Sequence, residues 1–189
     1  MATVKLNPIL EQLRGKVGDL VFKRYGDGTV VSRTPDFSDH EPTEAQLAHR
    51  DRFRQATVYG RVVMADEEAR AVYEAAAETR GKPIFSLTVA DFFNAPSVDE
   101  IDVSGYTGAS GDPIVVRASD DVDVQRVVVA LTDADGAALE SGEAAADAGH
   151  WVYTAQTDVA PGTTVRIGVQ AVDRPGGVGE DDTEIQTPA

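Results

Sequence analysis

The hydrophobic pattern of the chain changes at Ala95-Pro96-Ser97, and this change constrains the fold more than any other feature of the sequence. From Val98 onward, short runs that alternate apolar and polar residues are separated by turn signals. The turn signals are Asp133-Ala134-Asp135-Gly136, Pro161-Gly162 and Pro175-Gly176-Gly177. The runs between them predict strands near 98–103, 112–119, 124–133, 137–144, 150–158, 163–173 and 182–187. The second half of the chain is therefore expected to be an all-β domain.

Seven short strands in about 90 residues are typical of an immunoglobulin-like β-sandwich. The alternation is clear in Val165, Ile167, Val169 and Ala171, which we expect to face the core. Trp151 or Tyr153 is expected to fill that core.

Charge is divided in the same way as the hydrophobic pattern. Residues 1–60 carry nine Lys/Arg and eight Asp/Glu, residues 61–95 carry four and six, and residues 96–189 carry four and eighteen. Nearly all of the formal net charge of −15 therefore lies in the last segment. Such a surface repels nucleic acid phosphates, so we expect no nucleic acid partner at the second half.

Length and composition limit the remaining possibilities. A chain of 189 residues fits two small domains, which we place at 1–95 and 96–189. The sequence has no Cys, which excludes a disulfide framework and a thiolate metal site. Arg outnumbers Lys among the seventeen basic residues, because only Lys5, Lys16, Lys23 and Lys82 are Lys. An acidic, Lys-poor composition fits a halophilic source, and a GC-rich genome gives the same bias.

The N-terminal segment predicts an arm and a β-hairpin. Residues 1–14 are expected to form an arm with a short helix that Asn7 and Pro8 begin. Val17–Tyr25 and Thr29–Arg33 are rich in β-formers, and Gly26-Asp27-Gly28 supplies the turn between them. A lone two-stranded ribbon is marginal in water. We therefore expect this hairpin to need a partner sheet, from the second domain or from another copy of the chain.

Three helices are expected between the hairpin and the sandwich. Thr43 and Gln46 form a capping box that opens a helix running to about Met64. Asp66 caps a second helix, which Gly81-Lys82-Pro83 ends, and the short link predicts that the two form an antiparallel pair. Residues 86–94 predict a third short helix, with a strand as the alternative. The expected fold class is α+β, with a hairpin and an antiparallel helix pair followed by the sandwich.

Helical spacing places Ala45, Ala48, Phe53, Ala56, Tyr59, Gly60 and Val63 on the inner face of the first helix. The opposite face carries Arg residues beside apolar ones, which a fully solvated helix does not need. This face could contact phosphates or a carboxylate-rich protein surface, and in a repeating assembly it could meet the acidic domain of another copy. The expected interface residues, including those of the hairpin, are Leu20, Phe22, Val30, Leu47, Arg50, Arg54, Val58 and Arg61.

No catalytic constellation is visible in the sequence. The three His residues show no metal-ligand spacing, and Gly26-Asp27-Gly28 lacks the Lys-Ser/Thr of a phosphate-binding loop. We therefore expect no enzyme activity and no cofactor. The nearest approach to a metal site is a set of acids that suits Ca²⁺, although eighteen acidic residues in one domain will also cluster without a ligand. The set comprises Asp120, Asp121, Asp123 and Asp173, with Asp102 at another strand end.

Residues of about 15–80 resemble a module of uncharacterised bacterial and phage-associated proteins. The resemblance lies in Gly15–Tyr25, in Val30–Ser38, in a helix with Gln46, Arg50, Phe53 and Ala56, and in Asp66–Tyr73. The remainder is similar in pattern to bacterial and phage immunoglobulin-like domains. The resemblance implies a particle or surface assembly as context, and it brings no catalytic residue.

These observations predict a non-enzymatic structural protein of a viral or virus-like particle, such as a capsid or tail decoration protein. Residues 1–95 would dock onto copies of the chain or other particle proteins, and residues 96–189 would face solvent. The alternative is an immunoglobulin-like adhesion module that recognises a glycan or a protein. Met1–Leu6 lacks the pattern of a signal peptide, and no stretch is long and apolar enough for a membrane span. We therefore expect cytoplasmic synthesis followed by incorporation into a virion or extracellular particle, as a homo-oligomer without membrane contact.

Overall fold

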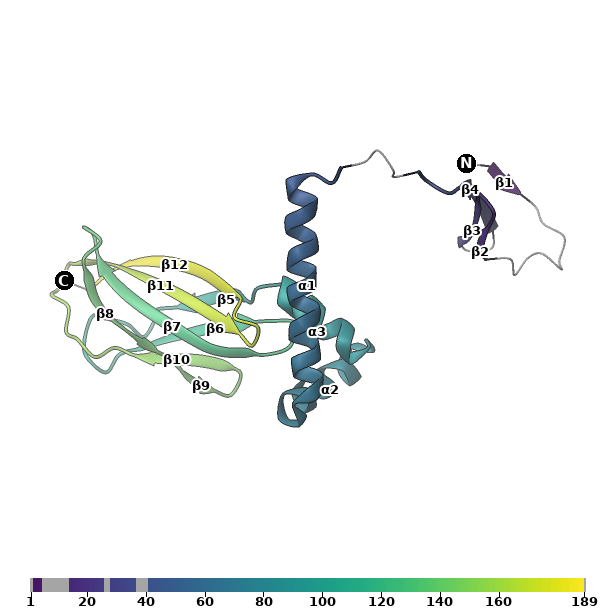
Figure 1. The fold of residues 1–189 in the computed structure, drawn as a ribbon. Coiled ribbons are helices and arrows are strands. Elements are labelled where there is room, and N and C mark those ends of the chain that lie inside the picture. The colour runs from purple at the N-terminus through teal and green to yellow at the C-terminus, as the bar shows by residue number, and fades with distance from the viewer. Residues whose placement is uncertain (1, 5–13, 26–27, 37–40, 189) are drawn as a thin grey trace. The chain divides into compact units, whose positions relative to one another are not determined.

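The structure, a computed structural model, describes residues 2–4, 14–25, 28–36 and 41–188 (Figure 1). The chain forms two compact units, Met1–Leu47 and Ala48–Ala189. The three helices therefore share a unit with the sandwich, whereas the sequence placed the boundary after residue 95. Contacts between the helices and the sandwich explain this grouping, because Val122 of the sandwich packs into the helical core.

The first unit contains a four-stranded antiparallel sheet in the order β1-β4-β3-β2. The strands are β1 (Ala2–Val4), β2 (Gly15–Val17), β3 (Leu20–Tyr25) and β4 (Gly28–Arg33). The predicted hairpin is confirmed as β3 and β4. The expected source of its partner strands, the second domain or another copy, is wrong, because β1 and β2 of the same segment pair with its two edges. Two strands of three residues each are too short for the alternation of apolar and polar residues to be recognised in the sequence.

The prediction of an N-terminal arm over residues 1–14 is wrong for residues 2–4. Residues 2–4 form a strand instead of an irregular segment. The predicted short helix at Asn7 and Pro8, and Gly26-Asp27 of the predicted turn, lie outside the described residues.

The second unit begins with three helices whose ends follow the predicted caps. They are α1 (Glu44–Ala65), α2 (Glu67–Arg80) and α3 (Ile84–Phe93). The backbone N–H groups of Thr43 and Gln46 donate to each other's side-chain oxygens over 3.1 and 3.3 Å, which is the predicted capping box. Asp66 Oδ1 accepts from two backbone N–H groups at the start of α2, and Gly81 ends α2 with φ of 62°. The third segment is a helix, so its strand alternative is excluded.

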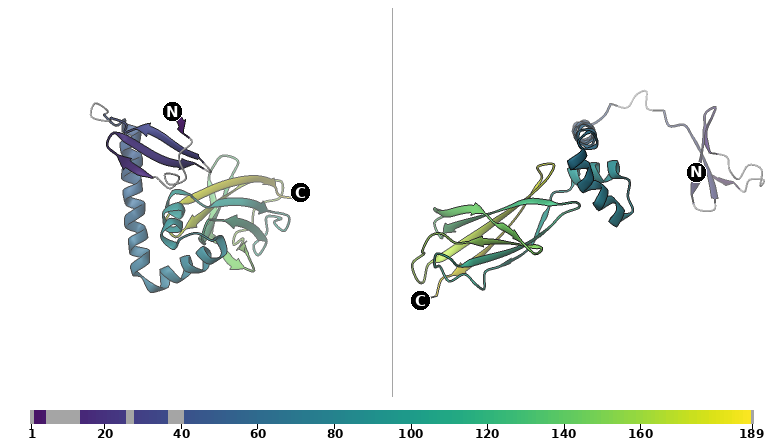
Figure 2. Two further views of the ribbon diagram at one scale, coloured as in Figure 1. Left: turned by 90° about the vertical axis from the view of Figure 1, so that its right-hand side faces the viewer. Right: turned by 90° about the horizontal axis from the view of Figure 1, so that it is seen from below.

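The predicted antiparallel pair of α1 and α2 is not confirmed. Figure 2 shows α2 turning away from the end of α1, and α1 instead packs against α3 at Gly60. Asp66 is the single residue between α1 and α2, and a one-residue link is shorter than the two to five residues of a helical hairpin. The helical core consists of Val63, Tyr73, Ala77 and Leu87.

The sandwich consists of two four-stranded antiparallel sheets, in the orders β5-β6-β10-β9 and β12-β11-β7-β8. The first contains β5 (Ser97–Asp102), β6 (Pro113–Ser119), β9 (Ala145–Asp147) and β10 (His150–Thr154). The second contains β7 (Val124–Asp133), β8 (Ala138–Glu143), β11 (Thr164–Asp173) and β12 (Val178–Gln186). The seven predicted strands are confirmed, and β9, a strand of three residues, was missed.

The core of the sandwich forms between these sheets as the alternation predicted. Val165, Ile167, Val169 and Ala171 of β11 are all buried. Tyr153 is buried in this core together with Tyr106, which was not predicted, whereas Trp151 lies partly exposed at its margin. None of the helices that the structure describes is long and apolar enough to cross a membrane.

Candidate functional site

The two faces of the N-terminal sheet differ in character. Directly opposed residues of antiparallel strands share a face, and the register pairs Phe22 with Val31 and Leu20 with Val17. Val30 pairs with Lys23 and lies on the other face. The predicted interface residues Leu20 and Phe22 are therefore not on the same side of the sheet as Val30. We call the side with the larger apolar set the N-terminal apolar face: Val17, Leu20, Phe22 and Val31.

The N-terminal apolar face is open to solvent at Val17 and Leu20 and partly buried at Phe22 and Val31. Val17 is 58% exposed and Leu20 is 41% exposed. Among residues 14–25, 28–36 and 41–47, no apolar side chain is buried, and the buried residue is Thr29, which lies on the same face. A sheet gains stability when one of its faces packs against another layer. The described part of this unit supplies no such layer.

Helix α1 carries a second exposed surface. Its residues 44–55 are all exposed, so Ala45, Ala48 and Phe53 do not face a core as the helical spacing predicted. Only the part that reaches α3 is buried, at Ala56, Gly60 and Val63. The predicted inner face of α1 extends beyond the buried part, because the spacing of apolar residues cannot show where α1 ceases to contact α3.

The outward side of α1 contains the predicted Arg and apolar residues. Leu47 is 51% exposed and Val58 is 54% exposed, and Val62, which the sequence analysis missed, is 63% exposed. We call this side the α1 outer stripe: Leu47, Arg50, Arg54, Val58, Arg61 and Val62. The spacing of Val62 from Val58 was the signal that could have identified it.

The Arg residues of α1 have different surroundings. Arg54 pairs with Asp51 over 3.0 Å at an exposed position, which reduces its availability to a partner. Arg52 instead turns back toward α3, where its guanidinium lies 5.0 Å from the centre of the Phe93 ring. Among the described residues, no carboxylate lies within ion-pair distance of Arg50 or Arg61. These two guanidinium groups are therefore the cations of the α1 outer stripe that could form an ion pair with a partner molecule.

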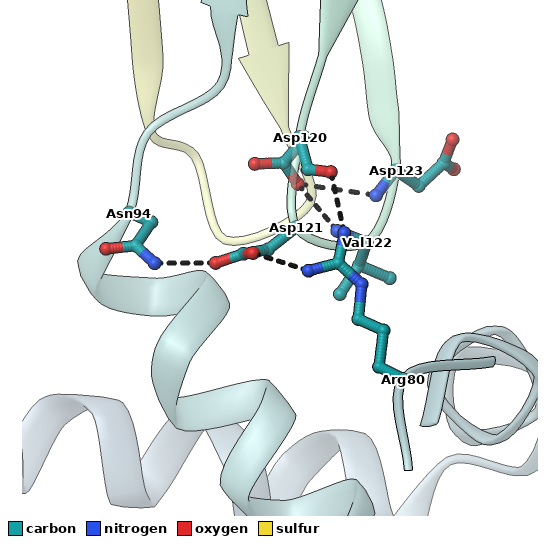
Figure 3. Close-up of polar contacts among 6 residues, drawn as sticks. All are labelled: Arg80, Asn94, Asp120, Asp121, Val122 and Asp123. Carbon is teal, nitrogen blue, oxygen red and sulfur yellow. Dashed lines mark hydrogen bonds and ion pairs between the residues drawn. The ribbon is translucent and has the colours of Figure 1, made fainter. Parts of the chain in front are cut away.

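The predicted acidic cluster forms a joint between the helices and one pole of the sandwich (Figure 3). Arg80 Nη1 lies 2.7 Å from Asp121 Oδ1, and Arg80 Nη2 donates to the carbonyl oxygen of Asp120 over 3.2 Å. Asn94 donates to the other oxygen of Asp121. The Asn94 hydrogen bond and then Arg80 lower the pKa of Asp121 below its ordinary value, with burial opposing them. Asp121 therefore holds the helices to the sandwich.

The proposed Ca²⁺ ligands do not all converge, although Asp120 and Asp173 lie close enough to interact electrostatically. Asp123 accepts from Gln125 over 2.8 Å and lies 4.0 Å from Arg174. Asp102 is at the opposite end of β5 from the joint, because Ser97 is the residue that pairs with Ser119. Asp173 is buried beside the joint, with one oxygen bonded to the Gly177 N–H. No group of three or more His, Asp or Glu residues in the described segments is placed to hold a metal ion.

A buried hydrogen-bonded chain lies beneath this joint and was missed in the sequence. Tyr73 of α2 donates to Asp91 Oδ2 of α3, and the Tyr59 hydroxyl lies 2.7 Å from the Tyr73 hydroxyl. Asp91 is 1% exposed. Burial raises its pKa to about 7, although the Tyr73 hydrogen bond opposes this. The sequence signal was present, because Asp91 is the one charged residue of α3, whose other residues are apolar or carry only a hydroxyl group.

The outer face of the second sheet is acidic and concave. Small residues in its middle, Ala130, Ser141 and Gly168, line an open groove of about 800 Å³. Glu180 and Asp182 of β12 form one wall of the groove. Arg166 makes a bidentate ion pair with Asp182, with Nε 2.9 Å from Oδ2 and Nη2 2.8 Å from Oδ1. The groove can accept a ligand with hydroxyl or amide donors.

No protein-family model matches the sequence, and no curated protein is significantly similar to it. Among solved structures, the chain is similar to CopC from Methylosinus trichosporium OB3b, with 14% identity and a TM-score of 0.38 over 49% of this chain and 93% of that one. It is also similar to an engineered protein from a structural genomics programme, with 23% identity and a TM-score of 0.35 over 55% of this chain and 26% of that one. Likenesses this low carry no argument about fold or function.

Proposed function

We propose that the protein is a non-enzymatic structural subunit of a viral or virus-like particle. In this proposal the N-terminal sheet and α1 dock onto neighbouring copies, and the acidic sandwich, which we place in the immunoglobulin-like class, projects into solvent. The observation that carries the proposal is the N-terminal apolar face, which is open at Val17 and Leu20 and has no described covering layer within its unit. A partner molecule would supply the missing layer.

Charge supports the choice of a second copy as that partner. The α1 outer stripe presents Arg50 and Arg61 beside exposed Val58 and Val62. The outer sheet of the sandwich presents Glu180 and Glu184 on β12. A positive stripe and an acidic sheet on the same chain are complementary between copies. Such contacts weaken with added salt, over a Debye length of about 8 Å at physiological ionic strength.

The proposal is tested with two full-length double variants that make the same chemical change. Val17→Thr with Val31→Thr alters the N-terminal apolar face, and Val21→Thr with Val30→Thr alters the opposite face of the same sheet. Thr matches Val in shape and β-propensity, so the strands are kept. Mass photometry over a concentration series should show oligomers for the wild type and the second variant, and fewer for the first. Monomeric wild type at every concentration, or equal behaviour of the two variants, would refute the proposal.

The second candidate is an adhesion module that binds a glycan or a protein through the sandwich. The open groove of about 800 Å³ on the β12-β11-β7-β8 sheet favours it. Ser141→Arg in the full chain would fill this groove and leave the residues of the N-terminal sheet unchanged. Under the adhesion hypothesis this variant loses binding on a glycan array while its oligomeric state is unchanged. If the wild type binds no member of the array and no candidate protein, this candidate is removed.

A further inference from the structure

Three carboxyl groups from three elements meet where the helices join the sandwich. Asp91 comes from α3, Asp120 follows β6, and Asp173 ends β11. Asp91 and Asp173 are 1% and 3% exposed. The carboxyl groups of Asp91 and Asp120 lie within hydrogen-bond reach of each other, and both are close enough to Asp173 to interact electrostatically. This buried arrangement differs from the neighbouring Arg80–Asp121 contact, which is half-buried.

The hydrogen bonds of Asp91 and Asp120 leave one oxygen of each without a donor. Asp91 Oδ2 accepts from Tyr73, and Asp120 Oδ2 accepts from the N–H groups of Val122 and Asp123. Asp91 Oδ1 and Asp120 Oδ1 are both buried and have no partner. Buried polar atoms in folded proteins are almost always hydrogen-bonded. Two ionised carboxylates cannot satisfy each other, because neither has a hydrogen to donate.

The groups around this pair do not neutralise it. Tyr73 of α2 and Tyr59 of α1 contribute hydroxyl groups, and Asp173 adds a further carboxyl with one buried oxygen that lacks a donor. Of the nearby cations, Arg80 pairs with Asp121, and Arg174 lies 4.0 Å from Asp123, close enough to Tyr59 to interact electrostatically and with its buried Nε unpartnered. Within the described segments, no Lys or Arg nitrogen is in ion-pair distance of the Asp91, Asp120 or Asp173 carboxyl groups.

We propose that Asp91 binds a proton and, when protonated, donates a hydrogen bond to Asp120. This hydrogen bond holds α3 against the β6–β7 loop until rising pH removes the proton. One proton supplies the donor that Asp91 Oδ1 and Asp120 Oδ1 both lack, and it relieves the repulsion between them. The raised pKa of Asp91, about 7, places its loss near neutral pH. The resulting joint is tight in mild acid and loosened above neutrality. This device goes beyond the proposed function, because it lies within one chain and does not require assembly.

The test compares Asp91→Asn with Asp123→Asn in the full-length protein. An Asn amide can donate to Asp120 at every pH, so it mimics the protonated acid at position 91. Asp123 is an exposed neighbour, and its variant controls for the loss of one negative charge. The melting temperature of the wild type and of Asp123→Asn should fall by several degrees between pH 5 and pH 8, and that of Asp91→Asn should change much less. An equal fall in all three proteins would overturn the proposal.

Two measurements on the wild type keep the proposal testable if Asp91→Asn does not fold. The ¹³C signal of the Asp91 carboxyl should titrate near neutral pH, and hydrogen exchange in α3 and residues 120–123 should accelerate above it. Titration of Asp91 near pH 4 would overturn the proposal. A rise in wild-type melting temperature on addition of Ca²⁺ at pH 8, abolished by Asp91→Asn, would also overturn it, because the free oxygens would then be ligands of a cation.

Discussion

Gly60 of α1 lies directly against Thr88 of α3. A Cβ atom at position 60 would sit 2.6 Å from the Thr88 hydroxyl oxygen and 2.9 Å from the Phe85 ring. Real Cβ contacts are not this short, so the absence of a side chain at Gly60 is what lets the two helices approach. Thr88 is fully buried there and donates to the Phe85 carbonyl over 2.8 Å. This crossing fixes the position of α3, and therefore of Asp91, relative to α1.

Gly60→Ala should destabilise the protein by about 1–3 kcal/mol through overpacking, despite a gain in helix propensity of about 1 kcal/mol. Chemical denaturation monitored by circular dichroism measures the change. Arg50→Ala, an exposed change on the same helix, should stay within about 0.5 kcal/mol. A Gly60→Ala variant as stable as the wild type would show that α1 and α3 do not pack as described.

Arg80→Ala should cost about 1 kcal/mol in the free energy of unfolding, because Arg80 holds both the Asp121 carboxylate and the Asp120 carbonyl at a half-buried position. The matched control on α2 is Arg70→Ala. Arg70 pairs with Glu74 at a more exposed position and should contribute about 0.3–0.5 kcal/mol. Equal losses in the two variants would show that Arg80 does not fasten the joint.

Two buried tyrosines should respond in opposite ways to loss of the hydroxyl. The Tyr73 hydroxyl bonds to Asp91 and Tyr59, so Tyr73→Phe should cost about 1–3 kcal/mol. The Tyr106 hydroxyl is buried without a partner, so Tyr106→Phe should be neutral or stabilising. Both changes remove one oxygen and keep the ring. Urea unfolding curves for the two variants compare them directly, and a larger loss at Tyr106 would contradict the hydrogen-bond assignment.

Stability should be greatest in mild acid. The folded state raises the pKa of Asp91 from 3.8 to about 7, so its contribution is fully present below pH 3.8 and is lost as pH rises to about 7. The slope over that window is at most about 1.4 kcal/mol per pH unit. The contribution of Asp121 to stability depends on pH in the opposite direction, because the pKa of Asp121 is lowered in the folded state and its contribution is lost in stronger acid. Unfolding free energies measured from pH 3 to pH 8 should therefore pass through a maximum on the acidic side of neutrality, and a maximum above pH 7 would contradict this assignment.

The sequence predicted local features well and relationships between distant residues poorly. The capping box at Thr43 and Gln46, the Asp66 cap and the turn at Gly81 depend on a few neighbouring residues, and each was found where predicted. The short strands β1, β2 and β9 were missed because three residues carry too little pattern. Among the candidate site residues, Leu47 and Val58 are exposed as predicted, whereas Val30 lies on the opposite face from Leu20 because the faces depend on register.

The sequence by itself determined the two long helices and the longer strands, because backbone propensity, capping and alternation act over a few residues. It also determined the division of charge between the two halves of the chain. Tertiary structure alone decided that Asp121 meets Arg80 and Asn94, and that Asp91 is buried beside Asp120. These groups are separated by 27 to 41 positions along the chain. The pKa and the role of an acid depend on burial and on the charges that folding brings near it, and neither is encoded in its immediate neighbours.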